Sequence, residues 1–185
     1  MSAVFREEYI GNFKFVENRD FKLSKPSIML LALPDAGLVG VIAASYMISR
    51  MGFEDIGGVD SPYIFPVVVV QGGDPKPPIR LFASDRALIL YTELALPVDV
   101  SSGLVAAAID YARLRGVDMI IGLTGLPAPN RMDLDEPATY FVTSSDELGK
   151  MLQDSGVKSL ERGLLAGPYA VLIKEASRKR IPAAV

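Results

Sequence analysis

The sequence contains no histidine and no cysteine among its 185 residues. Serine–histidine and cysteine–histidine catalysis are therefore excluded, and so are zinc sites built from thiolate or imidazole ligands. The absence of disulfides agrees with a reducing compartment, and we expect the protein to be cytoplasmic. Asparagine and glutamine are also scarce, which is typical of proteins from thermophiles because both residues are thermolabile.

Neither sign of charge dominates the chain. The 19 Lys and Arg residues and 22 Asp and Glu residues give a net charge of -3. No segment concentrates cations on one face, so the sequence offers no electrostatic basis for binding nucleic acid. Charged residues at 6–8 interrupt the N-terminus, so no signal peptide is predicted. The apolar run over 28–49 contains Pro34, and we interpret it as strand, turn and buried helix rather than a membrane span.

Half of the residues are hydrophobic, and the mean hydropathy is +0.29. A chain of 185 residues is typical of one domain that buries roughly 70% of the surface its unfolded form exposes. We therefore predict one domain over residues 1–185, with 1–25 as an N-terminal strand or packing arm. The high hydropathy indicates additional buried surface, in a three-layer core or between subunits.

Apolar strands alternate with helical patterns along the chain. The expected strands are 28–33, 63–71, 79–83, 87–92, 117–124 and 138–143, and the expected helices are 37–51, 101–115, 144–154 and 167–180. This alternation predicts a three-layer α/β/α fold with a mostly parallel sheet, which a hairpin within 63–83 makes mixed. Residues 181–185 begin another apolar strand where the sequence stops, which is consistent with a short core strand or with a truncated C-terminus.

The stretch from Leu33 to Gly40 is the most informative part of the sequence. Gly37 and Gly40 remove side chains where the helix starts, so another backbone or a ligand can approach closely. The helix over 37–51 is apolar on nearly all sides. A helix of this kind must be buried all round, which predicts a homo-oligomer or a protein-binding module.

Ligands of open α/β sheets usually bind beyond the carboxyl ends of the parallel strands. Three loops are expected there, and they carry Asp35, Glu93, Asn130 and Arg131. Two carboxylates with an arginine can serve acid–base or phosphate chemistry. The structural alternative is that Asp35 caps the helix and Glu93 pairs with Arg131. The candidate crevice or interface comprises Pro34, Asp35, Gly37, Gly40, Glu93, Pro97, Gly125, Pro127, Asn130 and Arg131.

No cofactor, metal ion or defined catalytic residue is predicted. The spacing of Gly37 and Gly40 matches half of a dinucleotide-binding motif, but Asp35 occupies the first glycine position and would repel an anion. The acidic residues Asp133, Asp135 and Glu136 lack the glycine and ligand number of a calcium loop, so we interpret them as a solvated turn.

Several motifs resemble those of the proteasome assembly chaperone 2 family, in its archaeal branch. They are Leu33-Pro34-Asp35-Ala36-Gly37-Leu38-Val39-Gly40, Gly52-Phe53, Pro77-Pro78-Ile79-Arg80, Glu93 with Leu96-Pro97, Gly125-Leu126-Pro127-Ala128-Pro129-Asn130-Arg131, and the stretch from Gly163 to Gly167. They keep the family's order from about residue 28 onward, and the first and fifth are distinctive.

The resemblance implies a fold similar to the nucleoside phosphorylases, arranged in homo-oligomers. It also implies an ATP-independent chaperone or adaptor whose partners are proteasome subunits or related assembly chaperones. Archaeal members often carry an ATP-grasp label, which no nucleotide-binding motif supports here. Some members bind proteasomes through a C-terminal hydrophobic-Tyr-any tripeptide, but this sequence ends in Ala183-Ala184-Val185. The alternative function is an enzyme that acts on a nucleoside or a phosphorylated small molecule in the crevice.

Overall fold

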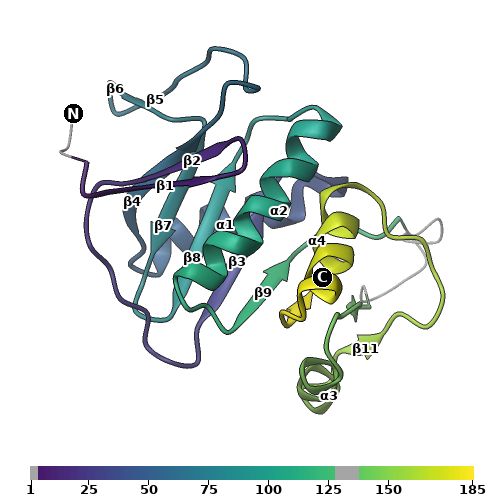
Figure 1. Cartoon of the computed structure of the whole chain (residues 1–185). Helices are drawn as coiled ribbons and strands as arrows, with labels where there is room; N and C mark the ends of the chain where they lie inside the picture. Colours follow the sequence, from purple (N-terminus) through teal and green to yellow (C-terminus); the bar gives the residue numbers. More distant parts are fainter. Residues whose placement is uncertain (1–3, 128–137) are drawn as a thin grey trace.

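A computed structural model describes residues 4–127 and 138–185 of the chain (Figure 1). Its main sheet has eight strands in the order β1-β2-β4-β7-β8-β3-β9-β12. Helices α2 and α4 lie in front of this sheet in Figure 1, and α1 lies behind it. The described part of the chain therefore has the predicted three layers.

The elements are short and follow one another closely. The strands are β1 Arg6–Ile10, β2 Phe13–Glu17, β3 Ile28–Ala32, β4 Glu54–Asp60, β5 Val69–Gln71, β6 Asp74–Lys76, β7 Ile79–Ala83, β8 Ala87–Thr92, β9 Met119–Gly122, β10 Tyr140–Phe141, β11 Lys158–Ser159 and β12 Ala183–Ala184. The helices are the 3-10 turn η1 Ala36–Leu38, α1 Val39–Arg50, α2 Val98–Leu114, α3 Asp146–Asp154 and α4 Gly167–Lys179.

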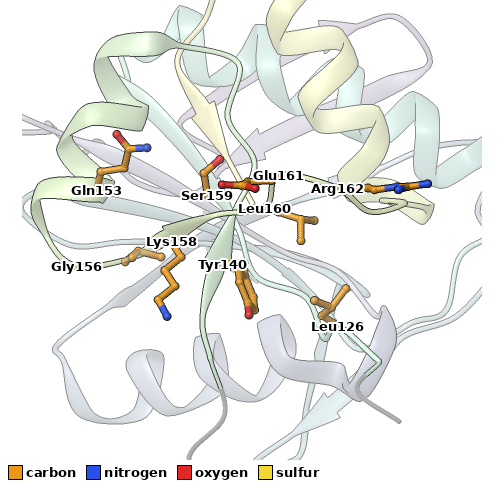
Figure 2. Close-up of a pocket in the computed structure, with 10 residues that line it drawn as sticks. Leu126, Tyr140, Gln153, Gly156, Lys158, Ser159, Leu160, Glu161 and Arg162 are labelled. Atoms are coloured by element: carbon orange, nitrogen blue, oxygen red, sulfur yellow. The ribbon is translucent and has the colours of Figure 1, made fainter. Parts of the chain in front are cut away.

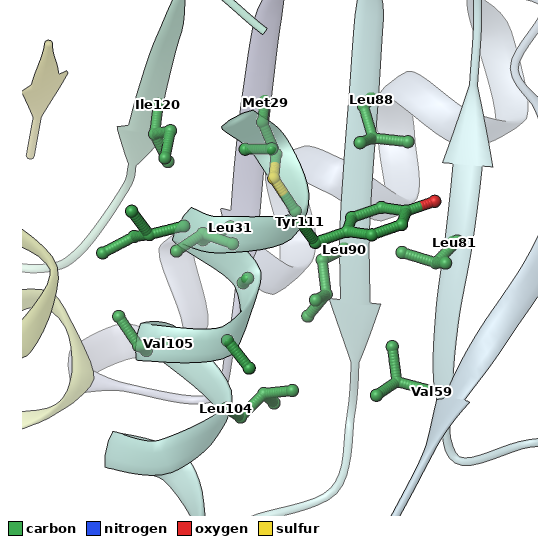
Figure 3. Close-up of a cluster of buried hydrophobic side chains, with 14 of the residues drawn as sticks. Met29, Leu31, Val59, Leu81, Leu88, Leu90, Leu104, Val105, Tyr111 and Ile120 are labelled. Atoms are coloured by element: carbon green, nitrogen blue, oxygen red, sulfur yellow. The ribbon is translucent and has the colours of Figure 1, made fainter. Parts of the chain in front are cut away.

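Alternate residues of the central strand β3 face the two helical layers. Met29 and Leu31 pack in the larger core with residues of α2 and α4. Leu30 and Ala32 pack on the other face with Val41 and other residues of α1. This is the period-two alternation of a strand buried on both sides, which explains why 28–33 reads as a continuous apolar run. Figure 3 shows the larger core beneath α2.

The sheet is mixed, as predicted, but parallel pairing is confined to one end. Strands β8, β3, β9 and β12 are parallel neighbours, whereas β1, β2, β4, β7 and β8 pair antiparallel. Three of the seven strand pairings in this sheet are parallel and four are antiparallel, so parallel strands do not predominate as expected. Hairpins in the N-terminal half account for the difference, because a short connection can join only antiparallel strands.

The predicted hairpin between 63–71 and 79–83 is wrong. β7 pairs with β4 and β8, while β5 and β6 form a separate small hairpin. The strand β4 gave no clear sequence signal because it contains Gly57 and Gly58. Both glycines are required by packing: a side chain at Gly57 would overlap the Val16 carbonyl, and one at Gly58 would overlap Pro77.

The predicted helices are present with small shifts of their ends. Ser145 caps α3, because its hydroxyl accepts a hydrogen bond from the Leu148 amide at 3.4 Å. The run over 28–49 is divided into β3, a turn and α1, as predicted. Among the described helices, none has the length and hydropathy needed to cross a membrane.

Candidate interaction surface

The loops that follow β3 and β9 meet at the carboxyl edge of the parallel strands, as predicted. The Asp35 carboxylate accepts a hydrogen bond from the Thr124 hydroxyl, so it bridges the two loops. It makes no side-chain cap to the helix, and the interpretation of Asp35 as a cap is wrong. The Gly125 amide donates to the Ala36 carbonyl at 3.0 Å. A Cβ at Gly125 would lie 2.6 Å from that oxygen, so this close contact requires glycine.

The two glycines at the start of α1 serve different purposes. Gly37 is exposed and has a φ of 69°, a conformation that favours glycine. Gly40 is buried, and a Cβ there would lie 2.6 Å from the Leu123 carbonyl oxygen and 2.8 Å from the Tyr169 hydroxyl. The group that approaches Gly40 is therefore the chain's own backbone and a tyrosine, rather than a ligand.

Tyr169 of α4 connects this helix to the end of β3, and the sequence analysis did not identify it. Its fully buried hydroxyl accepts from the Leu33 amide at 3.2 Å and lies 3.1 Å from the carbonyls of Leu31 and Leu33. Burial raises the pKa of the Tyr169 hydroxyl to about 12. The tyrosine therefore joins the end of β3 to α4 and stays protonated at neutral pH.

Helix α1 has one buried face and one exposed apolar face. Gly40, Val41 and Ala44 are buried against the sheet. Ile42 and Tyr46 are 63% and 66% exposed. Residues 4–127 and 138–185 therefore do not cover the helix all round, although its sequence pattern predicts burial on every side. A helix with so few polar side chains rarely leaves one of its apolar faces in solvent.

A hollow of about 560 Å³ lies between α1 and the end of β8; we call it the α1 hollow. It is lined by Pro34, Leu38, Val41, Ile42, Ser45, Tyr46, Ser49, Tyr91 and Glu93. Two of these residues, Pro34 and Glu93, belong to the predicted crevice. Glu93 is the only charged residue in this lining, so the described residues of the hollow include no cation that could hold a phosphate group.

Tyr91 and Glu93 form the polar wall of the α1 hollow. The Tyr91 hydroxyl donates to the Glu93 carboxylate at 2.7 Å. Burial, and then the neighbouring Glu93, raise the pKa of Tyr91 to about 12. Tyr91 is therefore a hydrogen-bond donor at neutral pH rather than a base, and nothing in this pair prepares a nucleophile.

A second hollow of about 750 Å³ lies at the same end of the molecule (Figure 2). Leu126 after β9 and Tyr140 of β10 line it together with the segment 156–162. Lys158, Glu161 and Arg162 are exposed and of mixed charge, so this hollow has no dominant sign. The sequence patterns gave no indication of it.

The remaining predicted residues are on the surface or outside the described part. Pro97 precedes α2 and is exposed, and Pro127 is also exposed. Asn130 and Arg131 lie outside the described residues, as do the acidic residues at 133–136, so their predicted roles stay predictions. Within residues 4–127 and 138–185, no group of three acidic, histidine or cysteine side chains is arranged to hold a metal ion.

The model of the PAC2 family matches residues 29–185 of the chain. The chain therefore belongs to the PAC2 family, which confirms the resemblance found in its motifs.

Solved structures with the same fold include proteins from Pyrococcus furiosus. PbaA, an archaeal homolog of proteasome-assembly chaperone, has a TM-score of 0.83 and 26% identity, over 94% of this chain and 71% of PbaA. PbaB, an archaeal proteasome activator, has a TM-score of 0.76 over 95% of this chain and 79% of PbaB, and its 16% identity supports the fold alone.

A sequence relative is the uncharacterized protein MJ0106 of Methanocaldococcus jannaschii, 26% identical over 119 residues. The match covers 64% of this chain and 50% of that protein. The chain therefore matches only half the length of this curated relative.

Proposed function

We propose that the protein is a proteasome-assembly chaperone or proteasome-binding adaptor that acts as a homo-oligomer and without ATP. The observation that supports this most is the environment of the polar side chains at the carboxyl edge of the parallel strands. The described polar groups are engaged within the chain: Asp35 with Thr124, and Glu93 with Tyr91. Several large apolar side chains at this edge, Val98, Leu126 and Leu164, are left in solvent, which suits contact with protein.

The exposed apolar residues at this edge come from separate loops. Val98 begins α2 and is 79% exposed, while Leu164 precedes α4 and is 87% exposed. Leu126, which follows β9, is 52% exposed. Because the ends of β8 and β9 and the start of α4 share one edge of the sheet, we propose that these residues contact the proteasome subunit.

The proposal is tested by mixing the purified chain with separately expressed proteasome α subunits and measuring complexes by native mass spectrometry. We expect a complex with the wild-type chain and a weaker one with Leu164→Asp. The control is Met151→Asp on α3, which changes an exposed apolar residue at a different element. The absence of a complex at every mixing ratio would contradict the proposal.

A further inference from the structure

The α1 hollow and the exposed face of α1 have the geometry of a helix-packing interface. Ile42, Tyr46 and Arg50 are spaced four residues apart and are all exposed, so they form one ridge along the helix, with Leu38 just before it. Val41, Ser45 and Ser49 form the adjacent row, and all three line the hollow. A ridge of large side chains thus lies beside a groove of smaller ones.

The groove residues permit a close approach by another helix. Ser45 and Ser49 are small, and the Ser49 hydroxyl is hydrogen-bonded to the Tyr46 carbonyl of its own helix at 2.9 Å. Packing of such four-residue ridges into matching grooves is the commonest way in which helices pack, with axes 8–10 Å apart and crossing at about -50°. The occupant that fits the groove is therefore a helix bearing a four-residue ridge.

Two charges lie at opposite ends of this surface. Glu93 lines the hollow together with Pro34 and Leu38, at the start of α1, whereas Arg50 is the last residue of the helix. Among the described residues, neither forms an ion pair within 4 Å. A helix of 12 residues is about 18 Å long, so the two charges cannot meet within one chain.

We propose that the α1 hollow receives the α1 ridge of a second copy of this chain in an antiparallel, two-fold symmetric pair. A two-fold axis pairs the same surface with itself, so it brings Arg50 of each copy to Glu93 of the other. In a two-fold pair each end of the ridge meets the opposite end of the other copy, so opposite charges at the two ends attract each other. A small ligand in the hollow could contact Ile42 and Tyr46, which line it, but would leave the exposed Arg50 outside the contact. This inference rests on the homo-oligomer part of the proposed function.

The register of the pair follows from the charges. If Arg50 of one copy lies opposite Leu38 of the other, Ile42 lies opposite Tyr46 and the axis passes close to Ser45. The chain has no cysteine of its own, so single-cysteine variants are informative. Ser45→Cys is expected to form a disulfide-linked dimer under mild oxidation, whereas Met151→Cys on α3 is not.

The closing experiment measures self-association of the full chain by light scattering over a range of concentrations. We expect Arg50→Glu and Glu93→Arg to weaken self-association about tenfold each, because each change places like charges together at two symmetric positions. The double variant is expected to regain the wild-type association, and circular dichroism checks that each variant is folded.

A wild-type chain that stays monomeric overturns the inference, and so does self-association that neither reversal changes. Failure of the double variant to regain association, with both single variants folded, also overturns it. Binding of α subunits, measured separately, distinguishes these results from failure of the proposed function. A monomeric chain that still binds α subunits contradicts only the self-pairing.

Discussion

Loss of the Arg115 guanidinium is expected to destabilise the protein strongly. Arg115 donates to the Glu17 carboxylate at 2.8 Å, and the Tyr111 hydroxyl donates to the same carboxylate at 2.6 Å. Glu17 is only 1% exposed, although it lies in β2 near the N-terminal end of the chain. The pair joins the β1–β2 hairpin to the end of α2. Phe15 stacks on the Tyr111 ring with centroids 4.3 Å apart, so the contact is also closely packed.

The magnitude follows from the burial of Glu17. Removing one partner of a buried ion pair leaves an uncompensated charge and typically costs about 3–5 kcal/mol. Arg115→Met keeps an unbranched apolar stem against Phe21, which the guanidinium contacts at 4.2 Å from the ring centroid, so the loss reports mainly the charge. Against a typical total of about 5–15 kcal/mol, the variant is expected to be marginally folded.

The measurement is urea unfolding followed by circular dichroism at neutral pH. The matched control is Arg19→Met, because Arg19 pairs with Glu54 at 2.7 Å but both side chains are more than half exposed. That exposed pair is worth about 1 kcal/mol or less. The double variant Arg115→Met with Glu17→Gln is expected to recover part of the stability, since no buried charge remains. Equal losses for Arg115→Met and Arg19→Met would refute the reasoning.

Three further predictions follow from the structure. Gly40→Ala is expected to lose about 1–3 kcal/mol in urea unfolding because its Cβ would lie 2.6 Å from the Leu123 carbonyl oxygen, whereas Gly103→Ala, whose Cβ meets only the Phe13 ring at 3.1 Å, should lose less. The stability that the Tyr91 and Tyr169 hydroxyls contribute should be fully present below about pH 10, the pKa of unfolded tyrosine, and be lost as pH rises towards 12, because their folded-state pKa values are raised to about 12; urea unfolding at pH 9, 10.5 and 11.5 measures this, and a flat profile over that range would contradict it. ATP, nucleosides and phosphate should leave the melting temperature unchanged, and a reproducible rise would favour the enzymatic alternative.

The sequence predicted best those elements whose burial leaves a direct pattern of apolar residues along the chain. Strand β3 and the helices α1, α2 and α4 were recognised because apolar runs and helical periodicity record burial directly. The strand β4 was missed because Gly57 and Gly58 carry no apolar signal, although the sheet requires them. The valine run ending at Val70 favours strand, yet Val68 and Val70 are mostly exposed and only three residues pair as β5. Propensity alone therefore misplaced the hairpin.

The candidate site was predicted in part for a similar reason. Topology places the ends of neighbouring parallel strands together, so the meeting of Asp35 with the loop after β9 could be expected. The partners of these groups could not, because Thr124, Tyr91 and Tyr169 have no motif and are brought in by tertiary packing. Tyr91 is the penultimate residue of the apolar strand β8 and lies two residues before Glu93, which was the one available signal for the polar wall of the hollow.

The position of Tyr169 constrains how this corner of the fold can change. Its ring occupies the space that a side chain at Gly122 would need, and its hydroxyl limits the space at Gly40. Substitution of Tyr169 therefore alters the space at both glycines. A homologous chain with a smaller residue at position 169 would have room for alanine at position 122, whereas the Leu123 carbonyl oxygen would still lie 2.6 Å from a Cβ at position 40. We therefore expect positions 122 and 169 to vary together and position 40 to remain glycine.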